Sequence, residues 1–154
     1  MKRRVFTALL FSGLLGLMLP RICLAQSVKK NIVIRRDWLR GGAYENGVMW
    51  LDFPILFGDD EGRLATPEGI YGILGKGKNY HSKKYDAPMP YSLFFTPARN
   101  AIHSRGPNFK LPEDFETRRW LRTHGCITAE HHIAEQLFYW ADNKTTLEII
   151  GKRV

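Results

Sequence analysis

Long hydrophobic runs are scarce in this sequence, and the single one lies near the N-terminus, from Val5 to Leu19. The run is too short to cross a membrane with these flanking residues, which argues against a spanning helix. The basic residues Lys2 to Arg4 precede it, and a small-residue pattern ending at Ala25 follows it. This layout predicts a secretory signal peptide over residues 1–25 and a mature, periplasmic domain over residues 26–154. An uncleaved membrane anchor is the alternative.

Cysteine is equally scarce. Cys23 falls within the predicted signal peptide, so Cys126 is the only cysteine of the mature chain. A lone cysteine cannot form an internal disulfide, which excludes a disulfide-stapled scaffold. Lipid attachment at Cys23 is disfavoured because Ile22 is not a small residue. A free thiol in an oxidising compartment is a liability unless it has a chemical task, although an inert cysteine packed as a small hydrophobic residue is a common alternative.

The mature chain also lacks internal repeats and basic blocks with interleaved aromatic residues, so nothing in it predicts nucleic-acid binding. The whole sequence has a net charge of +8, and removal of residues 1–25 leaves 19 basic and 15 acidic residues, a net charge of +4. This mild positive charge suits an anionic polymer of the cell envelope. The length of 154 residues predicts one domain with its own core.

Short apolar, β-branched segments dominate the mature chain and predict a mainly β domain, a sandwich or a barrel. Asn46-Gly47 between apolar runs predicts a hairpin, and residues 75–90, rich in Gly, Lys, Tyr and Pro, predict a long loop. An apolar stripe predicts one main helix over Thr128–Ala141, while "EDFETRRWL" favours a shorter one. The other expected strands are Ile32–Leu39, Gly69–Leu74, "YSLFFT", "NAIH" and "TLEII".

The sequence places Cys126 directly before the predicted main helix, with Thr128 as its cap. The helix dipole is therefore expected to favour a thiolate at Cys126. Gly125 permits a sharp turn and close approach of a substrate, and the backbone N–H groups there could face a developing oxyanion. A nucleophilic cysteine also needs a base. His103 and His124 are both candidates, although His124 is constrained by lying only two residues from the cysteine.

Four motifs together resemble the YkuD-type L,D-transpeptidase catalytic domain. They are "ATPEGIYGIL", "APMPYSLFFT", "AIHS" and "THGCIT", in that order, and the resemblance covers residues 32–154. The resemblance implies a β-sandwich with a helix after the catalytic cysteine. It also implies a two-step acyl transfer on peptidoglycan stem peptides, with acylation by carbapenem-type inhibitors and no cofactor.

The resemblance assigns a role to each residue of these motifs. Cys126 matches the nucleophile, and His103 matches the base, held by the backbone carbonyl of Ser104. The backbone of His124, Gly125 and Cys126 matches the oxyanion hole. The matching substrate contacts are Tyr91 as a wall of the cleft and Thr123 as the residue that shapes the turn.

Two departures from the family pattern bear on the substrate. Many members have Arg two positions after the cysteine, where this chain has Thr128, so Arg118, Arg119 or Arg122 would have to bind a substrate carboxylate instead. The interval between the histidine and the cysteine holds 22 residues, longer than usual, and residues 107–120 are expected to form an additional loop or helix at the cleft.

Three functions remain open at this stage. The first is a peptidoglycan L,D-transpeptidase, which forms 3→3 cross-links, exchanges D-amino acids or anchors proteins. The second is a cysteine hydrolase on the same scaffold, an L,D-carboxypeptidase or amidase, and the third is an inactive wall-binding protein. A zinc site at His131, His132 and His124 is not expected, because adjacent histidines on a helix diverge. The oligomeric state is left open.

Overall fold

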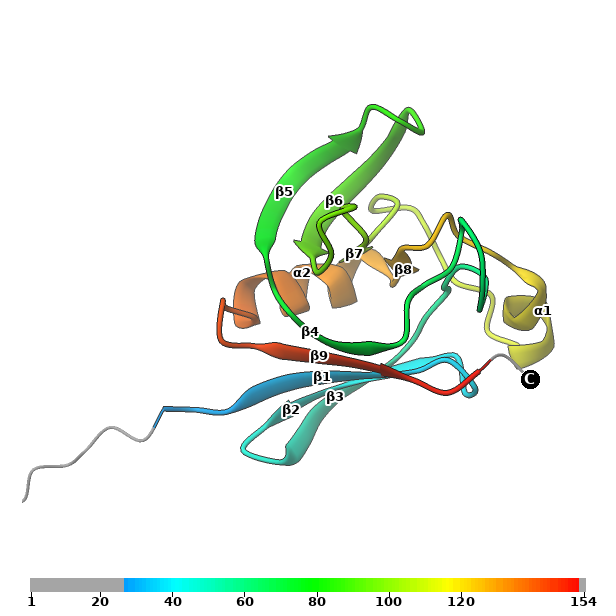
Figure 1. Cartoon of the computed structure of the whole chain (residues 1–154). Coiled ribbons are helices and arrows are strands. Elements are labelled where there is room, and N and C mark those ends of the chain that lie inside the picture. Colours follow the sequence, from blue (N-terminus) through cyan, green and yellow to red (C-terminus); the bar gives the residue numbers. More distant parts are fainter. Residues whose placement is uncertain (1–26, 153–154) are drawn as a thin grey trace, which may run out of the picture.

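The computed structural model describes residues 27–152, in which nine strands form two sheets (Figure 1). The larger sheet contains, in spatial order, β3 (Val48–Pro54), β2 (Arg40–Glu45), β1 (Lys30–Arg35), β9 (Thr146–Ile150) and β4 (Gly69–Gly72). The smaller sheet contains β5 (Gly75–Ser82), β6 (Ala87–Phe94), β7 (Ala101–His103) and β8 (Ile127–Thr128). The mainly β fold with two sheets confirms the predicted fold class.

The β2–β3 hairpin forms where the sequence predicts it. Asn46 and Gly47 have φ angles of 50° and 84°, and two successive positive φ angles are what a two-residue hairpin turn of type I′ requires. The turn brings Glu45 opposite Val48 in the antiparallel register. The expected strands around residues 32–39, 69–74, 91–96, 100–103 and 146–150 also form, with boundaries shifted by a few residues.

The core lies between the two sheets and includes the helix α2 (His131–Trp140). Alternate residues of the central strands, such as Ile32 and Ile34 in β1, point inward and are fully buried. α2 buries Ile133 and Leu137 in the same cluster, and Figure 1 shows the helix between the sheets. The smaller sheet adds Leu93, Ile102 and Ile127 to this core, and Phe95, directly after β6, packs with them.

The prediction of a long loop over residues 75–90 is wrong. These residues form β5, the turn and the first half of β6, a hairpin that projects from the body of the molecule (Figure 1). β7 pairs only with Leu93 and Phe94 of β6, so Pro88 and Pro90 lie where β6 has a single neighbouring strand. Proline is tolerated there because its missing N–H faces no partner strand.

The main helix begins later than predicted. Thr128 exchanges two backbone hydrogen bonds with Leu56, 2.9 and 2.8 Å, and belongs to β8, so it does not cap the helix. α2 begins at His131, and Glu130 occupies its N-cap position. A second helix, α1 (Phe115–Trp120), begins after Asp114, whose side chain accepts a hydrogen bond from the Thr117 N–H at 2.9 Å. α1 confirms the shorter helix favoured by the sequence.

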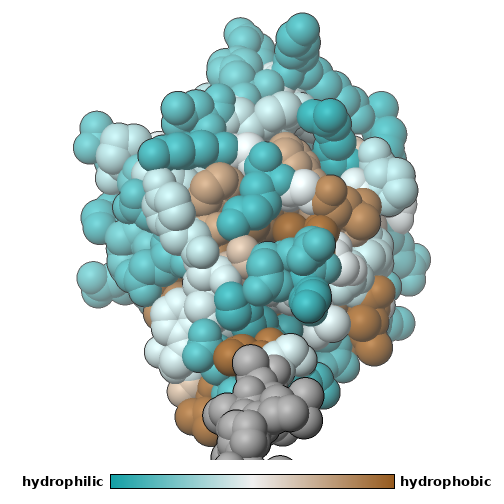
Figure 2. Space-filling model, turned by 90° about the vertical axis from the view of Figure 1, so that its left-hand side faces the viewer, coloured by the Kyte–Doolittle hydropathy of each residue, from teal (hydrophilic) through white to brown (hydrophobic). Residues whose placement is uncertain are grey.

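The surface is polar with scattered apolar residues. Figure 2 shows hydrophobic residues in separate patches among hydrophilic ones on one face of the molecule. No helix within residues 27–152 is long and apolar enough to cross a membrane. The predicted signal peptide lies outside the described residues.

Candidate active site

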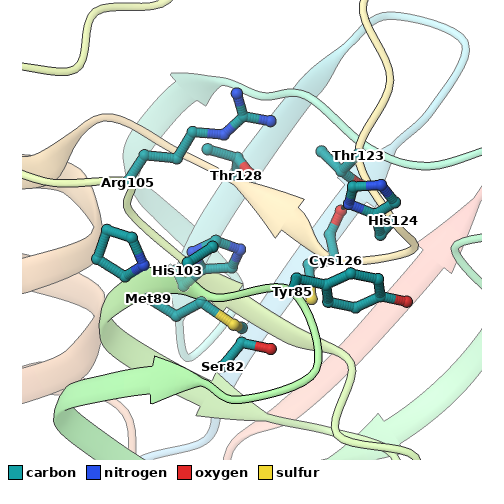
Figure 3. A pocket seen from close by; sticks show the side chains of 11 residues that line it. Ser82, Tyr85, Met89, His103, Arg105, Thr123, His124, Cys126 and Thr128 are labelled. Atoms are coloured by element: carbon teal, nitrogen blue, oxygen red, sulfur yellow. Dashed lines mark hydrogen bonds between the residues drawn. The ribbon is translucent and has the colours of Figure 1, made fainter.

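A cavity of about 340 Å³ opens beneath the tip of the β5–β6 hairpin, beside β7 and β8 (Figure 3). It is lined by Ser82, Tyr85, Ala87, Pro88, Met89, His103, Arg105, Thr123, His124, Cys126 and Thr128. These residues come from three separate parts of the sequence. Five of the nine residues predicted for the site from sequence face elsewhere or act through their backbone, as described below, whereas His103, Thr123, His124 and Cys126 line the cavity.

Strand pairing brings the predicted base to the predicted nucleophile. β7 ends at His103, β8 begins directly after Cys126, and the two strands are parallel neighbours, with Ile102 opposite Ile127. Figure 3 shows the His103 ring and the Cys126 thiol in the same cavity. Two side chains separated by 22 residues in the sequence therefore share one site.

The His103 imidazole is held by the backbone. Its Nδ1 lies 2.7 Å from the Ser104 carbonyl oxygen, which can only accept a hydrogen bond, so Nδ1 carries the proton. The neutral ring then has its unprotonated nitrogen at Nε2, as a general base requires. Burial lowers the pKa of His103 from 6.5 to about 4; the Ser104 carbonyl opposes this shift, and the Arg105 charge adds to it.

The thiol of Cys126 is also held in its neutral form. Burial raises its pKa, and a hydrogen bond from the Ala101 backbone only partly opposes this. The expectation that a helix dipole stabilises a thiolate is wrong, because β8 and two further residues separate Cys126 from the first turn of α2. Both shifts favour the uncharged forms, a neutral thiol and a neutral imidazole in one cavity.

Close packing and several hydrogen bonds hold the turn that carries the thiol. Gly125 has a φ of 97°, and a Cβ there would lie 2.8 Å from both the Ala65 carbonyl oxygen and Asn100 Nδ2. The Gly125 carbonyl accepts hydrogen bonds from Thr66 Oγ1 at 3.1 Å and from Asn100 Nδ2 at 2.9 Å. Thr123 Oγ1 donates across the turn to the Cys126 carbonyl. The Thr123 side chain thus links the start of the turn to its end.

Replacing Thr66 by valine is expected to destabilise this turn. The fully buried hydroxyl accepts a hydrogen bond from the Gly58 N–H at 2.8 Å and donates one to Gly125, and valine retains the shape but makes neither bond. We expect the free energy of unfolding in urea to fall by roughly 1–3 kcal/mol. Thr66→Ser, which keeps the hydroxyl, is the matched control. Equal stability of the valine and serine variants would contradict this role.

The backbone at this turn leaves two N–H groups for an oxyanion. The Gly125 N–H already donates to Thr123 Oγ1 at 3.3 Å, so it is a poorer candidate than the sequence suggested. The N–H groups of His124 and Cys126 have no side-chain or loop acceptor within residues 27–152. Donors of this kind stabilise charge that develops on a carbonyl oxygen.

Tyr91 does not form a wall of this cavity. It has a φ of 57°, its ring packs against Phe138 and His131, and its hydroxyl donates to Glu135 of α2 at 2.6 Å. The aromatic residue at the cavity is instead Tyr85, at the hairpin tip, which stacks on the His124 ring with centroids 4.4 Å apart. Tyr85 lies within the segment predicted as a loop, and no sequence signal singled it out.

The predicted arginines also lie away from the cavity lining. Arg122 Nε contacts Asp59 at 3.1 Å, and Arg119 contacts Glu116 within α1 at 3.6 Å. Arg118 is buried and donates to the Pro112 and Glu113 carbonyl oxygens. The arginine that does line the cavity is Arg105. Its position two residues after His103 was the available signal, because alternate residues of an extended chain share a face.

A second opening is also lined by Tyr85, His124 and Cys126. It is lined in part by the basic residues Arg63, Lys83, Lys84 and Arg99. Residues 27–152 contain no group of three or more His, Cys, Asp or Glu side chains that could bind a metal ion. His131, which was not expected to bind zinc, lies with its Nδ1 3.3 Å from the Ser104 hydroxyl oxygen.

Comparison with known proteins identifies the fold and the family. The chain resembles a solved L,D-transpeptidase from Stackebrandtia nassauensis, with 21% identity and a TM-score of 0.68, over 81% of this chain and 57% of that one. It also resembles an Enterococcus faecium L,D-transpeptidase mutant, with 16% identity and a TM-score of 0.67, over 79% and 50%. The chain thus spans between 50% and 57% of the length of these two structures. No match was found among curated proteins.

The same fold occurs in the structure of the L,D-transpeptidase LdtMt1 in complex with imipenem, with 17% identity and a TM-score of 0.64, over 80% of this chain and 59% of that one. At these identities the structures establish the fold alone. The model of the YkuD family, the L,D-transpeptidase catalytic domain, matches residues 32–149. Because this match covers most of the sequence, the chain belongs to the L,D-transpeptidase catalytic domain family.

Proposed function

We propose that this protein is a periplasmic peptidoglycan L,D-transpeptidase that transfers an acyl group through Cys126. The main support is the placement of Cys126 and His103 in one cavity, with the imidazole fixed by the Ser104 carbonyl in the tautomer that a general base needs. Family membership supports the reaction class. The predicted signal peptide and the mild positive charge of the mature chain support export toward an anionic envelope polymer.

In the first step His103 Nε2 accepts the proton of the Cys126 thiol as sulfur attacks the carbonyl carbon between residues three and four of a tetrapeptide stem. The carbonyl oxygen becomes an oxyanion that faces the N–H groups of His124 and Cys126. The imidazolium then gives its proton to the departing amine, the C–N bond breaks, and D-alanine leaves. The product is a thioester on Cys126.

In the second step an amine attacks the thioester. His103 accepts a proton from this amine, the C–S bond breaks, and the thiol is restored when the imidazolium returns the proton to sulfur. A diaminopimelate side chain as the acceptor yields a 3→3 cross-link, a free D-amino acid yields exchange, and a protein amine yields anchoring. Water as the acceptor would instead make the protein an L,D-carboxypeptidase or amidase.

Inhibitor acylation tests the nucleophile directly. Because LdtMt1 was solved in complex with imipenem, we expect mature protein incubated with a carbapenem to gain the mass of one inhibitor molecule. The Cys126→Ala variant is expected to gain none, and a mass gain by this variant would rule out Cys126 as the acylated group.

Purified disaccharide-tetrapeptides then identify the acceptor. New 3→3 dimers or D-amino-acid exchange products, detected by mass spectrometry, are expected for a transpeptidase. Tripeptides alone would replace the proposal with a hydrolase. Binding of the muropeptide with no product at all would favour the inactive wall-binding protein.

A further inference from the structure

Within residues 27–152 two buried side-chain polar atoms have no hydrogen-bond partner, Arg118 Nε and Thr128 Oγ1. The Arg118 side chain is already anchored elsewhere, through Nη1, in the loop before α1. Thr128 differs because it is 1% exposed and lines the cavity that holds Cys126 and His103. A buried hydroxyl without a partner is unfavourable. A bound substrate can supply the missing partner at this position.

The positively charged side chain of Arg105 lines the same cavity as this hydroxyl. Arg105 is exposed, lies 5.2 Å from the centre of the Phe109 ring, and forms no ion pair with any carboxylate in the described part of the chain. Figure 3 shows Arg105 and Thr128 on one side of the cavity, across from Ser82 and Met89. We name this pair the Arg105–Thr128 corner.

The strand register fixes the corner next to the base. His103 of β7 is the direct neighbour of Thr128 of β8, and Arg105 follows His103 by two residues. A group that contacts both Arg105 and Thr128 therefore lies beside the His103 ring. Both side chains can donate hydrogen bonds, and the guanidinium group is positively charged, so the corner suits an anionic acceptor with two oxygens.

The proposed reaction places such an anion there. His103 must reach the nitrogen of the leaving amino acid to protonate it, and in D-alanine a single carbon atom separates that nitrogen from the carboxylate. The carboxylate of the leaving residue therefore lies close to the base. We propose that Arg105 and Thr128 bind the C-terminal carboxylate of the leaving amino acid, and so select acyl donors that end at this residue. This inference rests on the proposed function for the identity of the ligand.

The experiment compares a tetrapeptide stem with its C-terminal amide, which has the same shape but no negative charge at its C-terminus. Binding is measured by calorimetry in the Cys126→Ala background, and turnover is measured with intact Cys126. We expect Thr128→Val to weaken binding of the acid roughly ten-fold, and Arg105→Gln to weaken it by a similar or larger factor. Neither substitution should change binding of the amide by more than about two-fold. Thr128→Ser should restore acid binding, and Lys144→Gln, which removes one charge from an exposed turn, should leave it unchanged.

Thermal unfolding separates this role from a structural one. If the Thr128 hydroxyl has no partner in the free protein, Thr128→Val should unfold at the same temperature as the wild type or at a higher one. A lower unfolding temperature would mean that the hydroxyl supports the fold, and would overturn the proposal. Equal loss of acid and amide binding in the variants, or no preference of the unsubstituted site for the acid, would also overturn it.

Turnover by intact Cys126 tests the proposed function, whereas preferential binding of the acid tests the carboxylate site. Preferential binding of the acid that depends on Arg105 and Thr128, but without any turnover by intact Cys126, would refute the transpeptidase and leave the carboxylate site established. Turnover of acid and amide at equal rates would support an acyltransferase and refute the carboxylate site.

Discussion

Replacing His103 by glutamine is expected to lower the rate of acylation of Cys126 by roughly two to four orders of magnitude, the usual contribution of a positioned general base. The effect should be large because the thiol rests in its protonated form: burial raises the pKa of Cys126, and no helix dipole reaches it. Glutamine can occupy the space of the ring but cannot accept the thiol proton. The rate of mass gain with a carbapenem measures the loss.

The pH dependence of the wild-type rate gives a second measure of the same residue. The pKa of His103 is about 4, because the ring is buried. The imidazole therefore stays unprotonated, and able to act as a base, well below the ordinary range of histidine. We expect the acid side of the profile of kcat/KM to fall near pH 4 and not near pH 6.5.

The same burial predicts how stability changes with pH. Between pH 6.5 and pH 4 the unfolded chain binds a proton at His103 and the folded chain does not, so the free energy of unfolding decreases as the pH falls through this range. For His103 alone the decrease is about 3 kcal/mol, and it levels off below pH 4. His103→Gln should remove this part of the acid sensitivity, as measured by urea unfolding at several pH values.

An exposed histidine provides the control. His132 lies on α2 with a side chain that is 59% exposed, and His132→Gln should change neither the acylation rate nor the acid sensitivity measurably. If His103→Gln retained the wild-type acylation rate, His103 would not be the base. If it retained the full acid sensitivity, the ring would not be buried as a neutral group in solution.

Features set by local chemistry were predictable from the sequence. Asn46-Gly47 specifies its hairpin because both residues accept positive φ angles without help from the rest of the chain. The motif around Cys126 likewise predicted a sharp turn at Gly125, where φ is 97°. These properties depend on residues within a few positions of each other.

Features that depend on residues far apart in the sequence were not predictable from the sequence. Threonine is a residue type that often caps a helix, and Thr128 precedes an apolar helical stripe. Its backbone is instead paired with Leu56, more than seventy residues earlier, and it belongs to the strand β8. The segment from Gly75 to Pro90 has loop-like composition, yet it forms strands because β5 and β6 pair with each other along their length. Composition cannot reveal a partner strand.

Side-chain direction explains the remaining differences at the site. Tyr91 was expected at the cavity, but a positive φ angle turns its ring toward α2, and a single such residue reverses the alternation of faces along a strand. Arg119 and Arg122 are close to Cys126 in sequence and meet acidic partners outside the cavity. Arg105 is more distant in sequence, but it lies two residues beyond His103, where β7 ends, and it lines the cavity.

Replacing Gly125 by alanine is expected to abolish most activity. Its φ of 97° is unfavourable for alanine, and the added Cβ would lie 2.8 Å from the Ala65 carbonyl oxygen, which is backbone and cannot simply rotate away. The turn must shift, and a displacement of about 1 Å between reacting groups can lower a rate about a hundred-fold. We expect a loss of at least this size in acylation of Cys126, with a lower unfolding temperature.

Gly62→Ala separates the effect of the unfavourable φ angle from the effect of the Cβ clash. Gly62 has a similar φ of 81°, but a Cβ there meets nothing within 4 Å, so this variant carries only the backbone strain, about 1–2 kcal/mol. It should lower stability modestly and leave acylation intact, because Gly62 is outside the cavity lining. A wild-type acylation rate in Gly125→Ala would show that the turn tolerates a side chain. The close packing of Gly125 would then have no part in placing the thiol against His103.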